Sequence, residues 1–386
     1  MANVLTGLDV LAAEGGARLR GQRVGIITTD CAVDREYRDA IAVIGSLPGV
    51  TVARLFAAEH GVRGEQADGA PIADGVDPLS GIRVHSIYGP RLWPDGAALA
   101  DLDAVVFDIC DVGARFYTRA ATLVYCLRAA AQAGTHFVVL DRPNPIGGVA
   151  VEGPSLRPGF ESFVGLAGLP VRHGLTLGEL ARFFNAAENL NANLEVIHVE
   201  GWTRATWYDQ TSLPWILPSP NLPTLDTAIV YPGTCFVEGC TASEGRGTTR
   251  PFEIIGAPGI EPHRFARELN ALNLPGVYFR PTYFCPAARK HAGQVCGGVQ
   301  LHVPDREAFR PVLAGYAVLR ALYHLWPEQF AWRPAKGNGL TPIDRLAGGT
   351  WLREAVAADA DPFEVAETWR ADEREFRGRR EEWLLY

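Results

Sequence analysis

The chain has 386 residues, of which 47% are hydrophobic and 21% are charged, and its formal net charge is −8. This composition is typical of a globular protein with a sizeable core and room for two or three domains, and it excludes a mostly disordered chain. An acidic balance without a long basic run argues against nucleic acid or an anionic membrane surface as the main partner.

The first half of the chain alternates predicted strands and helices. Short apolar or β-branched runs predict strands at 23–28, 50–56, 83–89, 104–110, 136–143 and 194–199. Helical spacing predicts helices near 36–47, at 118–134 and at 176–190. Thr176 and Glu179 have the spacing of a capping box at the start of the last helix. The alternation implies right-handed crossovers, so we expect a Rossmann-like, doubly wound parallel α/β sheet over residues 1–240.

The second half follows a different pattern. Residues 214–262 are dense in proline and glycine, which predicts mostly ordered loop. A helix near 262–273, strands near 276–284 and 297–303, a long helix near 305–326 and a charged amphipathic helix in the tail are then expected. We therefore expect a smaller C-terminal α+β auxiliary domain over residues 241–386.

Charged residues and glycines follow three predicted strands at their carboxyl ends. They include Glu59, His60 and Arg63 after the second strand, Asp108, Asp111 and Arg115 after the fourth, and Asp141 after the fifth. Ligands of an open parallel sheet bind beyond the carboxyl ends of its strands, so these loops are expected to converge on one edge.

Glu59 is the strongest candidate for a catalytic group. A partly buried carboxyl group there can have a raised pKa and act as a general acid, while the alternative is a carboxylate that binds donors of its own loop. His60 fits a hydrogen-bond organiser beside Glu59 better than it fits a base. Of Asp108 and Asp111, we expect one to face the site and the other to cap the next helix or to pair with Arg115.

Three further expectations concern the neighbouring loops. Asp141 fits an internal ion pair with Arg142 as well as it fits a substrate contact. In the block 240–252, Glu244 and Arg246 lie among small residues, and an arginine fork can bind a carboxylate or phosphate. The alternative is a rigid loop with a structural Glu–Arg pair. Tyr231 and Glu238 are further candidate polar contacts on the wall of the cleft.

Several chemistries lack their sequence motif. No GxGxxG fingerprint follows the first strand, and neither a P-loop nor a GxSxG elbow occurs. The nine histidines are scattered without a metal-ligand spacing, although Glu59, His60 and His173 could meet around a metal in space. We therefore expect no cofactor and no metal.

Cysteine usage and the chain start bear on location. The seven cysteines are an odd number without a CxxC pair, as expected for a reducing compartment. No apolar run approaches the roughly 20 residues of a membrane span, and the first residues lack the pattern of a secretory signal. The expectation is a cytoplasmic protein, or an exported one if the sequence is truncated.

A series of stretches, in order along most of the chain, resembles the NamZ/YbbC-type exo-β-N-acetylmuramidase family. They are EHGVRG (59–64), SIYG (86–89), FDICDVGARFYT (107–118), VLDRPNPIGG (139–148), VEGP (151–154), SFVGL (162–166), PVRHGLTLGELA (170–181), PSPNLPT (218–224), YPGTCFVEG (231–239) and SEGRGTTRPFE (243–253). The resemblance implies a glycoside hydrolase that releases terminal β-linked N-acetylmuramic acid from the non-reducing end of peptidoglycan fragments, at a site between a Rossmann-like and an auxiliary domain.

The resemblance also implies roles for the candidate residues. Glu59 would be the catalytic acid, and Asp108, Asp111 or Glu244 would supply the opposing carboxylate. The lactyl carboxylate of muramic acid needs a cation, for which Arg63, Arg115 and Arg246 are candidates. Retaining, inverting and substrate-assisted mechanisms all stay open, as do a non-catalytic carbohydrate-binding protein and a metal-assisted hydrolase.

Overall fold

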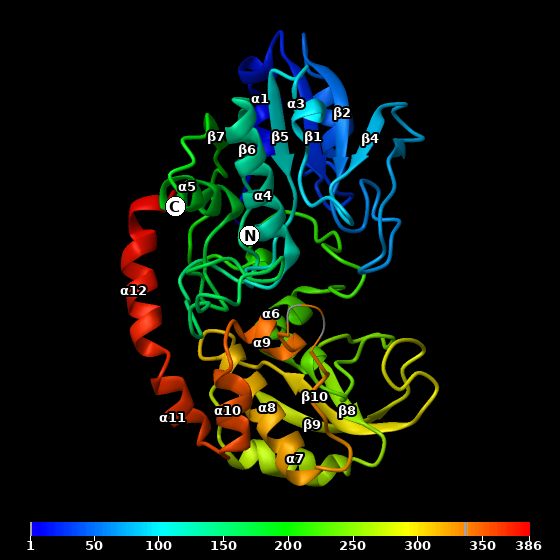
Figure 1. The fold of residues 1–386 in the computed structure, drawn as a ribbon, viewed down its shortest axis with the longest axis vertical. Helices are drawn as coiled ribbons and strands as arrows, with labels where there is room; N and C mark the ends of the chain where they lie inside the picture. Colours follow the sequence, from blue (N-terminus) through cyan, green and yellow to red (C-terminus); the bar gives the residue numbers. More distant parts are fainter. Residues whose placement is uncertain (1, 336, 338) are drawn as a thin grey trace.

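A seven-stranded sheet organises the upper half of the molecule, which we call the first lobe (Figure 1). The structure is a computed structural model that describes residues 2–335, 337 and 339–386. The strands are β1 (Arg23–Thr28), β2 (Thr51–Ala57), β3 (Gly75–Val76), β4 (Arg83–Ser86), β5 (Ala104–Asp108), β6 (His136–Leu140) and β7 (Leu194–Ile197). Their order is β3-β4-β2-β1-β5-β6-β7, and all neighbours are parallel except the edge pair β3 and β4. The predicted doubly wound sheet is confirmed, because the chain moves outward from β1 in both directions.

Helices cover both faces of this sheet. They are α1 (Gly7–Ala13), α2 (Ala40–Gly45), α3 (Gly96–Leu99), α4 (Thr118–Ala133) and α5 (Leu177–Ala187). On one face, Leu11 of α1 lies in a buried cluster with Ile26 of β1. On the other, Phe183 of α5 lies in a second cluster with Phe107 of β5. Both faces of the central strands are therefore buried, which explains their nearly continuous apolar sequence.

Local signals fix the helices that frame the site. The predicted capping box is present, since the Glu179 amide donates to Thr176 Oγ1 at 3.2 Å and the Thr176 amide donates to the Glu179 carboxylate at 3.0 Å. Helix α4 begins at Thr118, directly beyond the carboxyl end of the sheet, and ends at Gly134 in a left-handed conformation. The first turn of α4 therefore faces the loops in which the sequence predicts a site.

A three-stranded antiparallel sheet organises the lower half, which we call the second lobe (Figure 1). Its strands are β8 (Ile254–Ala257), β9 (Tyr278–Phe284) and β10 (Cys296–His302), in the order β8-β10-β9. Its helices are α6 (Leu225–Thr234), α7 (Pro262–Ala271), α8 (Pro311–Leu325), α9 (Pro342–Ala347) and α10 (Trp351–Ala357). The smaller α+β unit is thereby confirmed, while its boundary after residue 240 stays a prediction.

The expectation of mostly loop over 214–262 holds for residues 214–224, 240–253 and 258–261, but it missed α6 and β8, which lie in this stretch. Proline and glycine misled the prediction, since Pro232 and Gly233 lie inside α6. A Cβ at Gly233 would overlap the carbonyl of Pro311 in α8, so the glycine permits close packing of the two helices. Here tertiary packing overrides local propensity.

The tail connects the two lobes. It forms α11 (Pro362–Glu367) and α12 (Arg370–Arg380) in place of one continuous helix, and Figure 1 shows α12 running from the second lobe toward α5. Phe376 packs against Phe183 of the first lobe at a centroid distance of 5.8 Å. The Tyr386 hydroxyl donates to Asp141 at 2.7 Å. Among the described residues, no helix is both long and apolar enough to cross a membrane.

Candidate active site

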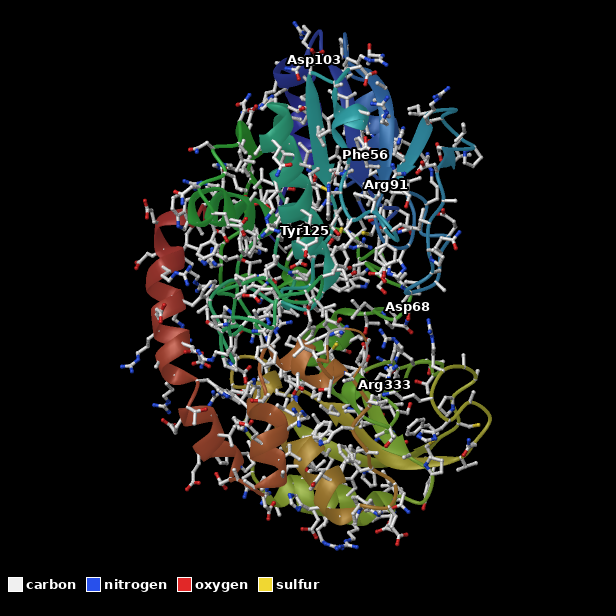
Figure 2. The ribbon with its side chains drawn as sticks, viewed as in Figure 1. Phe56, Asp68, Arg91, Asp103, Tyr125 and Arg333 are labelled. Atoms are coloured by element: carbon white, nitrogen blue, oxygen red, sulfur yellow. The ribbon has the colours of Figure 1, made fainter. Side chains whose placement is uncertain are left out.

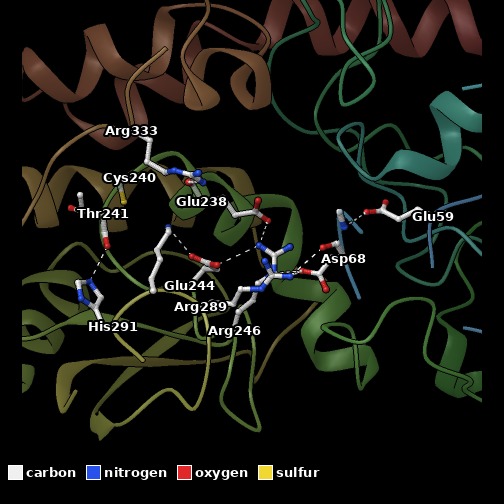
Figure 3. Close-up of a pocket in the computed structure, with 12 residues that line it drawn as sticks. Glu59, Asp68, Glu238, Cys240, Thr241, Glu244, Arg246, Arg289, His291 and Arg333 are labelled. Carbon is white, nitrogen blue, oxygen red and sulfur yellow. Dashed lines mark hydrogen bonds and ion pairs between the residues drawn. The ribbon is translucent and has the colours of Figure 1, made fainter. Parts of the chain in front are cut away.

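A cavity of about 700 Å³ opens where the two lobes meet, near the labelled Asp68 and Arg333 of Figure 2. The first lobe contributes Glu59, Asp68 and Gly69. The second lobe contributes Glu238, Cys240, Thr241, Glu244, Arg246, Arg289, Lys290, His291 and Arg333 (Figure 3). Charged groups of both signs thus face one cavity from two lobes, as a site for a polar ligand requires.

Glu59 is held by three hydrogen-bond donors at the first-lobe side of this cavity. It follows β2, and its Oε1 accepts hydrogen bonds from the Tyr88 hydroxyl at 2.8 Å and from the Gly69 amide at 3.1 Å. Its Oε2 accepts a hydrogen bond from Thr118 Oγ1 at 2.8 Å. The loops after β2 and β4 and the start of α4 therefore fix one carboxylate together.

The charge state of Glu59 differs from the sequence-based expectation. Burial raises the pKa of Glu59, but the charge of Arg119 and the hydrogen bond from Thr118 outweigh burial, so the pKa lies below its ordinary value. Arg119 is fully buried and donates to the Glu59 carbonyl at 3.0 Å. The structure thus does not have the raised pKa expected for Glu59. The sequence pattern could not show this, because it does not reveal that Arg119 lies against Glu59.

Glu244 lines the cavity on the second-lobe side. Its Oε2 lies 2.8 Å from Lys290 Nζ, and its Oε1 lies 3.3 Å from Arg246 Nη1. Burial raises the pKa of Glu244, but the charges of Lys290 and Arg246 outweigh burial and lower it. Glu244 is therefore ionised, and its negative charge is fixed in place by two cations.

Arginine, lysine and histidine side chains line the second-lobe wall. Arg246 Nη1 lies 2.6 Å from Glu238 Oε1, and the Arg246 guanidinium lies 4.9 Å from the ring centroid of Phe252. Lys290 Nζ also donates to the carbonyls of Val237 and Ala242 at 2.9 and 2.8 Å. Arg246 and Lys290 are therefore held by backbone and carboxylate groups of their own lobe, whereas Arg289 pairs with Asp68 of the first lobe at 3.0 Å.

Four of the nine described non-glycine residues with a positive φ lie in or beside the cavity. His60, Phe252, Arg289 and His291 have φ of 74°, 63°, 68° and 57°, in the left-handed region that non-glycine residues rarely adopt. Each such residue costs about 1–3 kcal/mol and persists where the surroundings enforce it, often at functional sites. The strain at Arg289 and His291 flanks Lys290, which pairs with Glu244. The backbone strain at Arg289 and His291 lowers the stability of the fold, and the surrounding packing maintains it.

The chain matches one family over almost its whole length. The N-terminal model of exo-β-N-acetylmuramidase NamZ matches residues 24–226, and the C-terminal model matches residues 229–386. The chain is 40% identical over 383 residues to peptidoglycan β-N-acetylmuramidase NamZ of Bacillus subtilis (strain 168), covering 99% of this chain and 91% of that protein. The chain belongs to the NamZ family. The resemblance inferred from the sequence is thereby confirmed.

Two solved structures share the NamZ-family fold of this chain. A DUF1343 family protein from Bacteroides fragilis NCTC 9343 is 34% identical, with a TM-score of 0.92, covering 100% of this chain and 99% of that chain. A second DUF1343 family protein from the same strain is 26% identical, with a TM-score of 0.76 and the same coverage. The two-lobed arrangement of this chain is therefore shared with these two proteins.

Four of the predicted site residues line the cavity of this NamZ-family chain: Glu59, Glu238, Glu244 and Arg246. Asp108 lies elsewhere, since its carboxylate accepts hydrogen bonds from Arg142 at 2.5 and 2.9 Å. Asp111 is buried, accepts a hydrogen bond from the Gly113 amide at 2.8 Å, and lies 3.8 Å from His173. Burial raises the pKa of Asp111 to about 6, without placing it in the cavity.

Arg115 has a structural position in place of the expected ion pair. Its guanidinium donates to the carbonyls of Pro154 and Leu169 in the first lobe and Leu346 in the second, at 2.9, 2.8 and 2.9 Å. Of the two aspartates expected to include its partner, Asp108 pairs with Arg142 and Asp111 accepts a hydrogen bond from the Gly113 amide. Arg115 therefore joins the lobes and does not reach the cavity.

Four other candidates form internal contacts away from the lining. Arg63 donates to Asp77 at 2.8 Å. Asp141 accepts hydrogen bonds from Thr176 and from the Tyr386 hydroxyl, both at 2.7 Å, so the alternative ion pair with Arg142 is replaced by neutral donors. The other two candidates are His60, whose Nδ1 lies 3.0 Å from the carbonyl of Gln66, and Tyr231, which is buried against Phe252.

Sequence reasoning missed most of the cations. Arg289, Lys290, His291 and Arg333 line the cavity, as does Asp68. One signal was present, since Lys290 is one of only two lysines in a chain whose other strong bases are all arginine. For the rest, no motif marks a residue whose role depends on the approach of another lobe. Among the described residues, no three His, Cys, Asp or Glu side chains are grouped as metal ligands.

Proposed function

We propose that this protein hydrolyses the β-glycosidic bond of a terminal N-acetylmuramic acid at the non-reducing end of peptidoglycan fragments, in the cavity at the junction of its lobes. The observation that carries the assignment to this cavity is that Glu59 and Glu244 face it from opposite lobes. Glycoside hydrolysis uses such a pair of carboxyl groups, one on each side of the scissile bond. Membership of the NamZ family supports the same reaction.

In this mechanism Glu59 gives a proton to the leaving oxygen as the glycosidic bond breaks. Glu59 is ionised in the structure, so it must take up a proton when a bound sugar excludes water. Tyr88 and Thr118 keep the carboxyl group oriented during that change. The released saccharide leaves with the proton. A water molecule then adds its oxygen to the anomeric carbon and returns a proton to Glu59.

Glu244 faces the positive charge that develops at the anomeric carbon. Lys290 and Arg246 keep Glu244 ionised, which suits a group that must stay negative throughout the reaction. The substrate also carries a 2-acetamido group, which can attack the anomeric carbon itself. Glu244 then orients that amide, and otherwise it attacks the carbon directly; both routes use the same fixed charge.

Arg246 supplies the cation for the lactyl carboxylate. Of the three arginines that the sequence offered for this role, Arg63 and Arg115 lie in structural contacts, and Arg246 lines the cavity. Its planar fork can bind a carboxylate with two donors, which favours muramic acid over a sugar without the lactyl group.

The test is release of a chromophore from an aryl β-N-acetylmuramide, with the matching aryl β-N-acetylglucosaminide as the comparison. We expect release from the muramide alone, at the same rate with and without a chelator. Equal rates on both sugars would refute recognition of the lactyl group. Binding without release would indicate a carbohydrate-binding protein, and activity lost with chelator would indicate a metal-assisted hydrolase.

A further inference from the structure

Asp68 reaches from the first lobe to two arginines of the second. Its Oδ2 lies 3.0 Å from Arg289 Nη2 and 3.5 Å from Arg246 Nε, as the dashed lines of Figure 3 show. Its Oδ1 accepts a hydrogen bond from Asn221 Nδ2 at 2.7 Å. One carboxylate is therefore held between two guanidinium groups inside the cavity.

The two arginines form a carboxylate-binding position that Asp68 fills loosely. The side-chain hydrogen bonds that the structure gives to Arg289 both end at Asp68, on its carboxylate and its carbonyl. Arg246 Nε is buried and, among the described residues, makes no hydrogen bond, since Asp68 lies too far for one. A carboxylate that sits closer can therefore gain a hydrogen bond that Asp68 does not make.

The loop that carries Asp68 lies at the surface and has room to shift. Residues 65–76, which include Asp68, are exposed or half-buried throughout. Gly69 has a φ of 73°, and no atom lies within 4 Å of the position that its Cβ would take. By contrast, Arg246 and Lys290 on the opposite wall are held by several partners each. Displacement would therefore move the Asp68 loop and leave Arg246 and Lys290 in place, while Arg289, whose side-chain hydrogen bonds both end at Asp68, becomes free to bind the incoming carboxylate.

We propose that Asp68 holds the place of the substrate's lactyl carboxylate, which displaces it from Arg246 and Arg289 on binding. The inference rests on the proposed function, and it makes Arg289 a second contact for the sugar acid. Two carboxylates cannot share this position without strong repulsion, so the ligand and Asp68 exclude each other. A sugar without a carboxylate leaves Asp68 in place.

The displacement also reaches Glu59. The amide of Gly69, the next residue, donates to Glu59 Oε1 at 3.1 Å, so movement of Asp68 withdraws a donor from that carboxylate. Loss of a donor to the charged form raises the pKa of a carboxyl group. Binding of the lactyl group thus prepares Glu59 as a proton donor, whereas a glucosaminide does not.

The direct test is calorimetric titration of free N-acetylmuramic acid and N-acetylglucosamine into wild type and Asp68→Asn. The amide keeps the shape and the Asn221 contact but loses the charge that competes with the ligand. If Asp68 occupies the carboxylate-binding position about nine-tenths of the time, loss of its charge lowers the Kd for N-acetylmuramic acid about tenfold. The Kd for N-acetylglucosamine stays unchanged. Asp74→Asn is the matched control, because Asp74 pairs with Arg91 at 2.9 Å outside the cavity.

Unchanged or weaker binding of N-acetylmuramic acid to Asp68→Asn would overturn the proposal and make Asp68 a positioning residue for the arginines. Asp68→Ser serves as the second variant if the amide does not fold, and the same tenfold gain is expected of it. Because binding is measured without turnover, this result is independent of whether the wild type releases a chromophore. Failure of the proposed function and failure of this inference are therefore distinguishable.

A pH profile tests the link to Glu59. The kcat/KM profile reports the acid in the free enzyme, and the kcat profile reports it in the complex. With the aryl muramide, we expect the basic limb of kcat to lie about one pH unit above that of kcat/KM. Coincident limbs would overturn the link between Asp68 displacement and Glu59.

Discussion

Replacing Glu59 by glutamine removes the proposed proton donor while keeping its surroundings. In the structure the carboxylate accepts hydrogen bonds from Tyr88, Gly69 and Thr118. A glutamine oxygen can keep the bonds from Tyr88 and Gly69, and its amide nitrogen can donate to the Thr118 hydroxyl, which is also an acceptor. Glu59→Gln should therefore fold, with a loss of at most about 2 kcal/mol from the missing attraction to Arg119.

The expected effect on catalysis is much larger than the effect on stability. An amide cannot give up an acid proton, and one positioned acid–base group contributes about 10²–10⁴-fold to the rate. The loss should reach this range on a natural disaccharide, whose sugar leaving group must be protonated. An acidic phenol needs little protonation to leave, so the loss on an aryl muramide should be at least about tenfold smaller.

The assay compares kcat/KM of wild type and variant on both substrates, with Glu188→Gln as the control. Glu188 pairs with Arg128 at 2.6 Å on the surface of the first lobe, away from the cavity, so its variant should keep wild-type rates. Equal losses of Glu59→Gln on both substrates would assign Glu59 to nucleophilic or electrostatic work. Near-wild-type hydrolysis of the disaccharide would remove Glu59 from the chemistry and leave Glu244 as the remaining carboxylate of the pair.

Three further changes test other parts of the structure. Arg246→Lys keeps the charge but loses the planar fork, so KM for the aryl muramide should rise about tenfold with a smaller change in kcat; a pure kcat loss would contradict lactyl recognition. Arg115→Met removes the Arg115 donor from three carbonyls, of which, among the described residues, only that of Leu169 keeps another bond, from the Leu156 amide at 3.0 Å, so urea denaturation should show a loss of about 2–3 kcal/mol, and wild-type stability would refute its role at the lobe junction. Burial raises the pKa of Glu152 from 4.5 to about 7, so the stability from its protonated form is complete below pH 4.5 and is lost as the pH rises through 7. Glu152→Gln should accordingly raise Tm at pH 8 but not at pH 4.5, and an equal shift at both values would contradict the assignment.

Strands and their edge were predictable because the signals are local. The run 104–110 is apolar on both faces. The strand that it forms, β5, lies between β1 and β6 and is buried along its whole length. The strand-end argument likewise found Glu59. It could not tell which strand-end groups face solvent and which neutralise one another, so Asp108 was taken as a candidate although it pairs with Arg142.

The second wall of the site could not be predicted from local patterns. Arg289 and Lys290 lie in the loop between β9 and β10, far in sequence from Glu59 and Asp68, and they meet them through the packing of two lobes. The charge state of Glu59 shows the same limit, since it depends on a guanidinium that belongs to α4. Sequence periodicity gives the faces of helices and strands, whereas the electrostatics of a site depends on distances between them.

The position of the cavity explains why a Rossmann-like sheet here lacks the dinucleotide fingerprint. In such a sheet the usual ligand crevice lies at the switch point, which is between β1 and β5 in this order. Here the Asp108–Arg142 ion pair closes that crevice at 2.5 Å, and a cavity of only about 20 Å³ is left beside Arg142, Tyr208 and Trp215. The buried ion pair holds the strand ends together and leaves little room for a ligand in the crevice. The candidate site lies instead one strand outward, at the loop after β2, where the second lobe contributes the cations that line the cavity.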